Sequence, residues 1–401
     1  MATSDYAISL ASVQAAAQRI DGLAHRTPVL TCHALEDVAT AAAGAGAAPK
    51  RLFFKVQDCK VSCDCENLQK VGAFKYRGAL NAVKKHLQEH PSGGDTTFVT
   101  HSSGNHAQAL ALAARDAHCK AVVVMPDNSP QVKQRAVRGY GAEVVLCAPT
   151  VQAREDGARA VEESMGAHFV HPSNDPDVMS GQGTVALELL EQAKQQFGVQ
   201  LDAILIPIGG GGLCSGVAMA AKVFAVEPVG AVDAFDSFQK RQLTGQTGPV
   251  NTVADGLRST LGEEPHSCSF HAKKPTELEA NDDGCDLTGD NNWPVIRDFV
   301  DEVLLVSDEE IVAAMKLIWE RMKLVGKWLL RHQLLVYPEH MPHHLTPSLT
   351  QQVVEPSGAV PAAAVLFNKL PASAEIKNVG IVFSGGNVDL EKLPWSPNAS
   401  T

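Results

Sequence analysis

Residues 96–125, TTFVTHSSGNHAQALALAARDAHCKAVVVM, contain two short apolar runs separated by an amphipathic stretch. The runs Thr96–His101 and Ala121–Met125 are typical of strands, and Asn105–Ala114 has the apolar spacing of a helix. A strand, a helix and a second strand in this order predict parallel pairing, because a helical crossover returns the chain to the same edge of the sheet. The stretch therefore indicates an α/β fold.

The same alternation extends along the chain. It continues through a helix, a strand and a helix at Pro130–Arg138, Glu143–Cys147 and Ala153–Met165. Two later strands, Leu201–Ile208 and Val379–Phe383, each run into a glycine-rich loop. Ligands of open α/β sheets bind beyond the carboxyl ends of the strands, so we expect the loops SSGN, GGGG and SGGN to meet at one crevice.

Composition limits the function classes. The 401 residues are 45% hydrophobic and 20% charged, which excludes a disordered chain and is enough for two domains. A net charge of −11 opposes binding to nucleic acid or anionic membranes and favours small-molecule partners. No apolar run reaches the ~18–20 residues of a membrane span, and the N-terminus lacks a targeting pattern, so we expect a cytoplasmic protein. The nine cysteines, an odd and sparse set, are expected to be reduced thiols.

Three segments carry candidate chemistry, and each has an ordinary structural interpretation as well. The run Gly209–Gly212 could bind a phosphate through backbone N–H groups at a helix start, or could be a tight turn. Lys75 lies between apolar neighbours, where an amine loses its proton more easily and can react with an aldehyde, although a surface lysine is the commoner case. The segment 101–106, HSSGNH, offers hydroxyl and N–H groups to a carboxylate, or caps a helix.

These segments together resemble the serine racemase and serine/threonine dehydratase family of fold-type II pyridoxal-phosphate enzymes. The matching stretches, in order along the chain, are HRTPVL, LFFK, ENLQKVGAFKYRGALNA, THSSGNHAQAL, AVVVMP, GQGTVALE, IPIGGGGLCSG, AVEPVGA, VADGL, WPVIRD and FSGGNVDL. The resemblance implies a tryptophan synthase β-like fold in two domains and a homodimer. The expected domains are a large one from residues 1–96 and 175–401 and a small one from residues 97–174.

The resemblance assigns the cofactor, pyridoxal 5′-phosphate, to particular residues. It makes Lys75 the Schiff-base lysine, with Phe74 packed beside the cofactor and Asn105 bonded to its ring hydroxyl. Ser384 faces the pyridine nitrogen, and a hydroxyl there makes the ring a moderate electron sink, which disfavours transamination. The phosphate is assigned to the residues Gly209, Gly210, Gly211, Gly212 and Leu213.

The resemblance also assigns substrate and metal sites. Ser102, Ser103 and Asn105 are expected to bind the substrate carboxylate, with Ser103 on the face opposite Lys75. Proton transfer on both faces racemises serine, whereas proton removal by Lys75 alone leads to loss of the β-hydroxyl. A divalent cation, Mg²⁺ or Ca²⁺, is expected at the carboxylates of Glu227 and Asp233 and the carbonyl of Ala231; without the resemblance these would be two unremarkable acids.

The expected activity is therefore serine racemisation with accompanying elimination of serine to pyruvate and ammonia. One alternative is an L-threonine/L-serine dehydratase, which Ala107 favours because racemase-like sequences usually carry glycine there. A second alternative is an inactive amino-acid-binding relative. Only residues 391–401 follow SGGNVDL, so we expect no appended regulatory domain.

Three inserts and one short junction depart from the family. The inserts cover Gln57–Cys65 and roughly residues 264–291 and 326–353, and they are either retained introns in a gene model or lineage-specific loops. Finding all three in the messenger RNA would exclude the first explanation. A zinc site at Cys59, Cys63 and Cys65 would lack a fourth ligand. Lys222 passes directly to Val223 with no evident turn between helix and strand. A missing turn would misplace Glu227 of the expected metal site, and this would favour an inactive relative.

Overall fold

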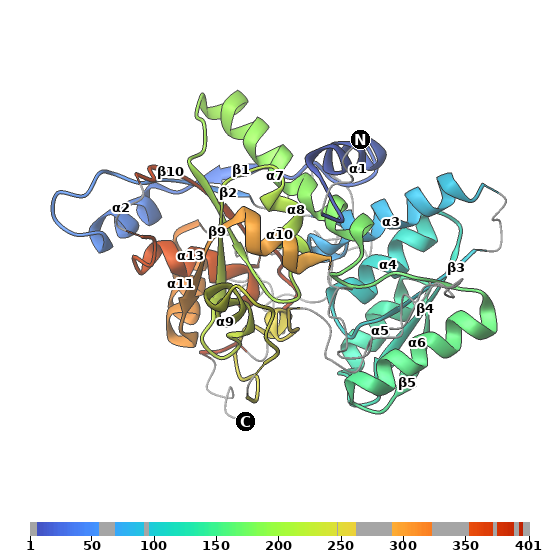
Figure 1. Cartoon of the computed structure of the whole chain (residues 1–401). Coiled ribbons are helices and arrows are strands. Elements are labelled where there is room, and N and C mark those ends of the chain that lie inside the picture. The colour runs from blue at the N-terminus through green and yellow to red at the C-terminus, as the bar shows by residue number, and fades with distance from the viewer. Residues whose placement is uncertain are drawn as a thin grey trace, which may run out of the picture.

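The computed structural model describes residues 6–55, 69–91, 96–246, 248–261, 291–322, 353–371, 375–388 and 393–395. These residues form two β-sheets that lie side by side, each with helices on both faces (Figure 1). The α/β architecture with parallel-rich sheets that the sequence predicts is confirmed. No helix in these ranges is long and apolar enough to cross a membrane.

Six strands form the larger sheet, in the order β1, β2, β10, β7, β8 and β9. They are β1 (Val29–Thr31), β2 (Arg51–Lys55), β7 (Ala203–Pro207), β8 (Val223–Pro228), β9 (Val300–Val306) and β10 (Asn378–Val382). β1 is antiparallel to β2, and all other neighbours are parallel. Because β10 pairs with both β2 and β7, the loops that follow β7 and β10 leave the same edge of the sheet.

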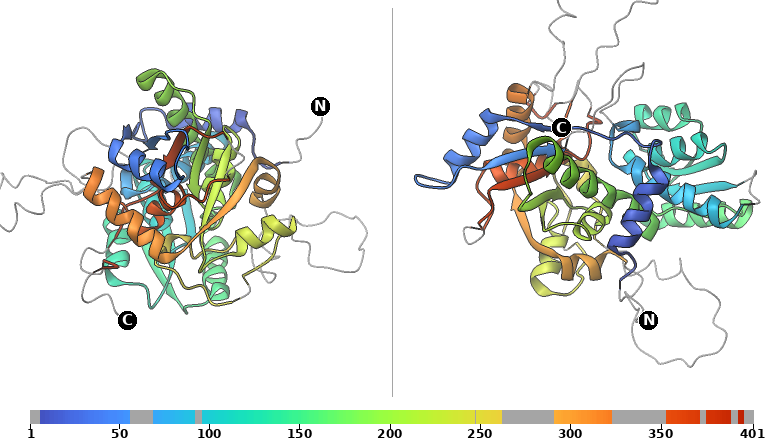
Figure 2. Two further views of the ribbon diagram at one scale, coloured as in Figure 1. Left: turned by 90° about the vertical axis from the view of Figure 1, so that its left-hand side faces the viewer. Right: turned by 90° about the horizontal axis from the view of Figure 1, so that it is seen from above.

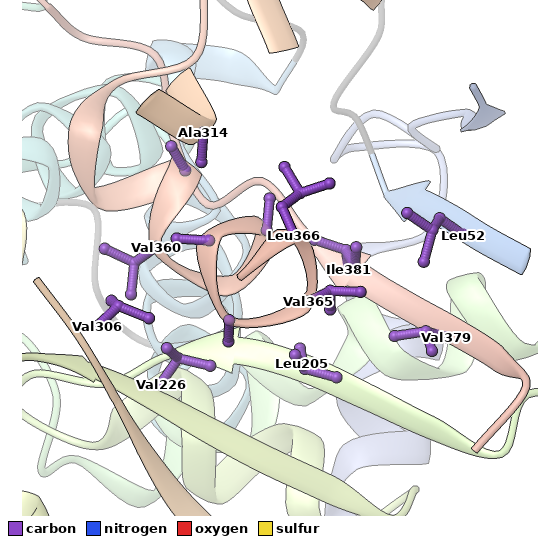
Figure 3. Packing of buried hydrophobic residues seen from close by; sticks show 14 of the residues in the cluster. Leu52, Leu205, Val226, Val306, Ala314, Val360, Val365, Leu366, Val379 and Ile381 are labelled. Atoms are coloured by element: carbon purple, nitrogen blue, oxygen red, sulfur yellow. The ribbon is translucent and has the colours of Figure 1, made fainter. Parts of the chain in front are cut away.

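One face of the larger sheet packs against α13 (Pro356–Leu366), a helix that is buried along its whole length (Figure 3). Leu205 and Val226 point toward this helix from the strands beneath it. Two further helices, α2 (His33–Ala42) and α11 (Asp308–Met322), complete the same cluster. An all-apolar helix of this kind is what a core position requires.

The opposite face of the larger sheet is covered by different helices. Successive strand residues point to opposite faces, so Ile204 and Ile206 pack away from α13. They contact α7 (Pro176–Phe197), α8 (Gly212–Ala218) and α10 (Asn292–Phe299). Helix α9 (Asp233–Lys240) also packs on this side, and α1 (Leu10–Ile20) contacts it through α7. Helix α1 lies across the junction between the two sheets, against α7 and α3 (Figure 2).

Four parallel strands form the smaller sheet, in the order β5, β4, β3 and β6. They are β3 (Thr97–His101), β4 (Lys120–Pro126), β5 (Glu143–Cys147) and β6 (His168–Phe169). One face packs on α3 (Lys75–Glu89), α4 (Asn105–Asp116) and α5 (Gln131–Gly139), and the other on α6 (Val151–Met165). Helix α3, which precedes residue 97, thus shares its core with the smaller sheet.

Two expectations about local structure are wrong. The Ala/Gly-rich composition of Ala39–Ala48 predicts a surface loop. The stretch is instead helical as far as Ala42, because α2 buries Leu35 and Ala39 against the larger sheet. A turn does separate α8 from β8: the helix ends at Ala218 and residues 219–222 connect it to Val223. The connection is short because the helix is only seven residues long.

The three inserts fall almost wholly outside the described residues, which stop at 55, 261 and 322 and resume at 69, 291 and 353. Cys59, Cys63 and Cys65 also lie outside them, so the expectation against a zinc site remains untested. The four described cysteines, Cys32, Cys119, Cys147 and Cys214, are free thiols.

Candidate active site

Lys75 is the first residue of α3, and its amine lies in a desolvated position. Its Nζ donates a hydrogen bond to the carbonyl of Pro172 at 2.7 Å and lies 5.2 Å from the centre of the Phe74 ring. Burial lowers the pKa of Lys75 from 10.5 to about 8, and no described carboxylate pairs with it to reverse the shift. An amine in this position is partly neutral near physiological pH and can act as a nucleophile or a base.

The segment before Lys75 is held by the SGGN loop that follows β10. Ala73 forms an isolated bridge with Gly385, and the Phe74 N–H donates to the carbonyl of Ser384 at 3.1 Å. Ser384 is buried, with 3% of its surface exposed. These backbone contacts place Ser384 and Lys75 together although the sequence separates them by about 300 residues.

A single amide connects the loops on this side of the site. The Nδ2 of Asn387 donates to the carbonyl of Val71 at 2.8 Å and to the Oδ1 of Asn105 at 2.8 Å. Val71 has a φ of 61°, a strained conformation for a β-branched residue that such external contacts must maintain. Asn387 lies within the SGGN motif, but the motif alone does not indicate that its side chain connects these loops.

Glu355 is a second residue of this site that the sequence motifs do not indicate. Its carboxyl is buried beside Gly385, and its Oε1 accepts from the Nδ2 of Asn105 at 3.3 Å. Burial and then the charge of Asp255 raise the pKa of Glu355 to about 8. The carboxyl is therefore a proton-holding group next to Asn105. A buried acid in the apolar segment VVEPSGAV is the signal that could have indicated it.

The SSGN loop joins β3 to α4 and reaches the same region through Asn105, the first residue of α4. The Ser102 N–H donates to the carbonyl of Val124 at 3.2 Å, and its Oγ accepts from the N–H of Gly104 at 3.3 Å. Ser102 and Ser103 are both partly exposed. Their hydroxyls lie where the strand ends, the position at which α/β sheets bind ligands.

The glycine loop that follows β7 has the features of an anion site. Gly211 has a φ of 80°, and α8 begins at the next residue. A Cβ on Gly210 would lie 2.6 Å from the Oγ of Ser173, and one on Gly212 would lie 2.7 Å from the Ser173 carbonyl. Within the described chain no acceptor pairs with the N–H groups of residues 209–213, although Leu213 and its neighbours are buried. Unpaired N–H groups at a helix start are suited to a phosphate.

The glycine loop meets the other loops through Pro172 and Ser173. Pro172 accepts the hydrogen bond from Lys75, and Ser173 is packed against Gly210 and Gly212. Lys75, the SSGN loop, the SGGN loop and the glycine loop thus form one continuous set of contacts. A covalent attachment point, a phosphate site and polar groups for a carboxylate are therefore close together, as an amino-acid enzyme with an aldehyde cofactor requires.

The two acids proposed to bind a metal lie at the end of β8 and the start of α9. The carboxylate of Glu227 accepts from the N–H groups of Ala234 at 3.0 Å and Phe235 at 2.8 Å, and Asp233 accepts from the N–H of Leu261 at 2.5 Å. Burial, followed by the charge of Asp233, raises the pKa of Glu227 to about 9. Neither acid forms an ion pair within the described ranges, where no three His, Cys, Asp or Glu side chains gather in metal-binding geometry.

Comparison with known proteins gives consistent results. The family model described as pyridoxal-phosphate dependent enzyme matches residues 48–328. A serine racemase from Arabidopsis thaliana is 40% identical over 97% of this chain and 96% of its own. The crystal structure of a serine racemase from Dictyostelium discoideum aligns with a TM-score of 0.71 and 36% identity, covering 96% of this chain and 100% of that one. The crystal structure of a threonine deaminase from T.th. aligns with a TM-score of 0.70 and 35% identity, covering 95% and 99%.

Proposed function

Because the chain belongs to the pyridoxal-phosphate dependent enzyme family, we propose that it interconverts L- and D-serine and also converts serine to pyruvate and ammonia. The observation that carries the proposal is the desolvated amine of Lys75 between the SGGN loop and the glycine loop. Whole-length identity of 40% to a serine racemase supports serine as the substrate.

The residues present fit the cofactor. The unpaired N–H groups of Gly209–Leu213 would hold the phosphate, Asn105 would bond the ring hydroxyl and Ser384 the pyridine nitrogen, with Phe74 beside the ring. When bound, pyridoxal phosphate supplies an aldehyde for an amine and an electron-withdrawing ring that stabilises negative charge on the substrate α-carbon. The hydroxyl of Ser384 carries no charge, so it binds the ring without protonating it.

The two outcomes differ in what happens after the α-proton leaves. Lys75, as the neutral amine, removes the proton from the α-carbon of L-serine. If the Ser103 hydroxyl delivers a proton to the opposite face, D-serine forms. If the β-hydroxyl leaves instead, hydrolysis releases pyruvate and ammonia. Ser102, Ser103 and Asn105 would hold the substrate carboxylate through both reactions.

A divalent cation between β8 and α9 belongs to the same proposal. Glu227 and Asp233 are buried acids without a basic partner among the described residues, which suits oxygen-ligated Mg²⁺ or Ca²⁺. The carbonyl of Ala231 and water molecules would supply the other ligands.

We also propose the organisation that the family suggests. The chain would form a homodimer in the cytoplasm, with a large domain from residues 1–96 and 175–401 and a small domain from residues 97–174. The four-stranded sheet, which spans residues 97–169, supports the small domain, although α3 (Lys75–Glu89) packs on the same sheet from before residue 97.

A dehydratase acting on L-threonine and L-serine is the alternative with specific support. The threonine deaminase matches this chain nearly as well as the serine racemase, and Ala107 follows the Asn-His pair of α4. Against the inactive alternative, the short junction before Val223 contains a turn, and Glu227 lies near the end of β8, where it pairs with Leu305 beyond a register shift at Val223 and Phe224.

A product assay tests the proposal directly. The protein loaded with pyridoxal phosphate and Mg²⁺ is incubated with L-serine, and D-serine is measured by chiral separation alongside pyruvate. We expect both products, and neither from Lys75→Ala. Pyruvate without D-serine would establish the dehydratase instead. Binding of serine without turnover would establish the inactive relative.

A further inference from the structure

One carbonyl of the glycine loop, that of Gly210, is bound by a buried side chain from a distant helix, Asn292 at the start of α10. We propose that Asn292 is a positioning residue that fixes the glycine loop in the conformation that binds a phosphate monoester. The inference rests on the proposed cofactor site, and it adds a residue that the motifs of the sequence did not indicate.

The Asn292 amide bonds the glycine loop and the two segments that flank it. Its Nδ2 donates to the carbonyl of Gly210 at 2.9 Å and to the carbonyl of Ser173 at 3.1 Å. Its Oδ1 lies 3.0 Å from the hydroxyl of Ser215, which can donate to it. The residue is buried, with 1% of its surface exposed. The surroundings therefore specify an amide: two carbonyls face its NH₂ group and a hydroxyl faces its oxygen.

These contacts determine where the loop N–H groups point. In a trans peptide the carbonyl and the following N–H point in opposite directions. Binding of the Gly210 carbonyl by Asn292 therefore directs the N–H of Gly211 to the other side of the loop. In the same way the Gly211 carbonyl accepts from the N–H of Ser215 at 2.9 Å, which directs the N–H of Gly212 away from α8.

A run of four glycines needs such contacts more than other loops do. Glycine has no Cβ to restrict rotation, so each peptide in the run can reorient at low cost. Side chains of α10 also leave no room for a side chain at position 211. A Cβ on Gly211 would lie 3.1 Å from the Asn292 Cβ and 2.9 Å from the Ile296 Cδ1. The N-terminus of α10 thus packs against the loop as well as bonding to it.

Asn292 is itself held in place. The Oδ1 of Asn174 accepts from the N–H of Asn291 at 2.8 Å and from that of Asn292 at 3.2 Å, and the Asn291 side chain donates to the Asn174 carbonyl at 2.8 Å. These bonds fix the start of α10 to the segment that contains Ser173. Asn292 therefore transmits a rigid position to the loop and does not simply follow it.

The role is testable through the phosphate of the ligand. Asn292 is uncharged, so its effect on affinity must pass through the loop N–H groups, and a ligand without a phosphate should not report it. Cofactor-free protein is titrated with pyridoxal 5′-phosphate and, separately, with pyridoxal, and binding is followed by absorbance. Asn292→Leu should raise the Kd of pyridoxal 5′-phosphate roughly tenfold and leave that of pyridoxal within about twofold.

A matched control and a second variant complete the test. Asn81 is also a buried asparagine, bonded to the Asp177 carbonyl at 2.7 Å and to Arg19 at 2.6 Å, so Asn81→Leu disturbs packing without touching the loop. It should leave the ratio of the two Kd values unchanged. Ser215→Ala removes the hydroxyl that lies 3.0 Å from both the Oδ1 of Asn292 and the carbonyl of Gly211, and it should raise the Kd of pyridoxal 5′-phosphate by roughly threefold.

The possible outcomes separate this inference from the proposed function. If the unmodified chain binds pyridoxal as tightly as its phosphate ester, the glycine loop is not the phosphate site and the cofactor proposal fails. If it prefers the ester but Asn292→Leu and Ser215→Ala keep that preference, the loop is correctly assigned and the role of Asn292 is refuted. Equal weakening of both ligands by the two variants would also refute it, because that result indicates a general structural role.

Discussion

The reactivity of Lys75 depends on burial and not on a charged partner. Its amine is held by a carbonyl and lies beside an aromatic ring, so desolvation alone lowers its pKa to about 8. The protonated form therefore dominates below that pH, and the neutral, nucleophilic form dominates above it.

The rate at which cofactor-free protein combines with pyridoxal phosphate should follow this titration. We expect the rate to rise about tenfold per pH unit up to roughly pH 8 and then level off, since only the neutral amine attacks the aldehyde. Stopped-flow absorbance between about pH 6 and pH 10 measures it, with Lys75→Ala as the control that shows no covalent change. A rate still rising at about pH 10 would mean that burial does not lower this pKa.

Ser103 is the residue that should separate racemisation from elimination. Loss of a positioned acid/base group costs ~10²–10⁴-fold in the step it serves, so Ser103→Ala should reduce D-serine formation from L-serine by about that factor. Pyruvate formation from L-serine should fall much less, whereas elimination from D-serine should fail with racemisation. Ser102→Ala, a change of the neighbouring hydroxyl, should affect both products similarly. If Ser103→Ala does the same, the serine only binds the carboxylate.

Residue patterns indicate those parts of the site that are local in sequence. Apolar Ala73 and Phe74 make Lys75 a candidate, and the consecutive glycines make the loop one, but each pattern also has an ordinary structural interpretation and only the resemblance gives them their expected roles. The bonds from Asn387 to Asn105 and from Asn105 to Glu355 join residues 282 and 250 positions apart. Nothing local in the sequence specifies them, because they depend on how β10 and α13 pack.

Helix α3 positions Lys75, and a buried ion cluster anchors that helix. The guanidinium of Arg77 bonds both oxygens of Glu188 on α7, at 2.5 and 3.0 Å, and the Nζ of Lys55 on β2 lies 3.1 Å from the same carboxylate. Although burial opposes it, the charge of Arg77 holds the pKa of Glu188 below its ordinary value. The ion cluster therefore joins α3, the helix that carries Lys75, to the larger sheet.

Removing the shared carboxylate should therefore destabilise the fold strongly. Glu188→Gln leaves the buried guanidinium of Arg77 without its counter-charge, which typically costs about 3 kcal/mol or more of unfolding free energy, whereas Lys55, whose pKa burial lowers to about 7, can lose its proton. Glu191→Gln, one turn further along α7, breaks an exposed pair with Arg26 and should cost less than about 1 kcal/mol. Urea unfolding of both variants measures the difference. Equal midpoints would show that the cluster does not anchor α3.

Elements differ in how well local sequence predicts them. The bounds of β5 agree with the expectation because the apolar run there lies between Gly141 and Pro149, residues that interrupt strands. The end of α8 could not be predicted, since Met219–Lys222 are good helix formers. Strand pairing determines where the helical region ends, because Val223 pairs with Ile204, whose N–H donates to the Lys222 carbonyl at 2.9 Å. Tertiary contacts here override helix propensity.

At the scale of the whole molecule, the two acids of the proposed metal site are connected to the cofactor site. Leu261, whose N–H bonds Asp233, also packs against Gly211, where an added Cβ would lie 2.8 Å from its Cδ1. Occupation of the site by a cation would thus stabilise β8, α9 and the edge of the glycine loop together. The native fold brings these segments together, so a cation should bind the folded state far more tightly than the unfolded chain.

Metal binding should consequently raise the thermal stability of the protein. At a Mg²⁺ concentration about 100 times its Kd, the stabilisation should be about 2.7 kcal/mol, measured as a higher Tm than in chelator. Asp233→Asn should lose this response. In chelator, however, the variant should be at least as stable as the unmodified chain, because it removes a buried acid that has no basic partner among the described residues, while an amide oxygen can still accept from Leu261. A Tm that neither Mg²⁺ nor Ca²⁺ changes, with Asp233→Asn less stable in chelator, would show that these acids serve the fold without a metal.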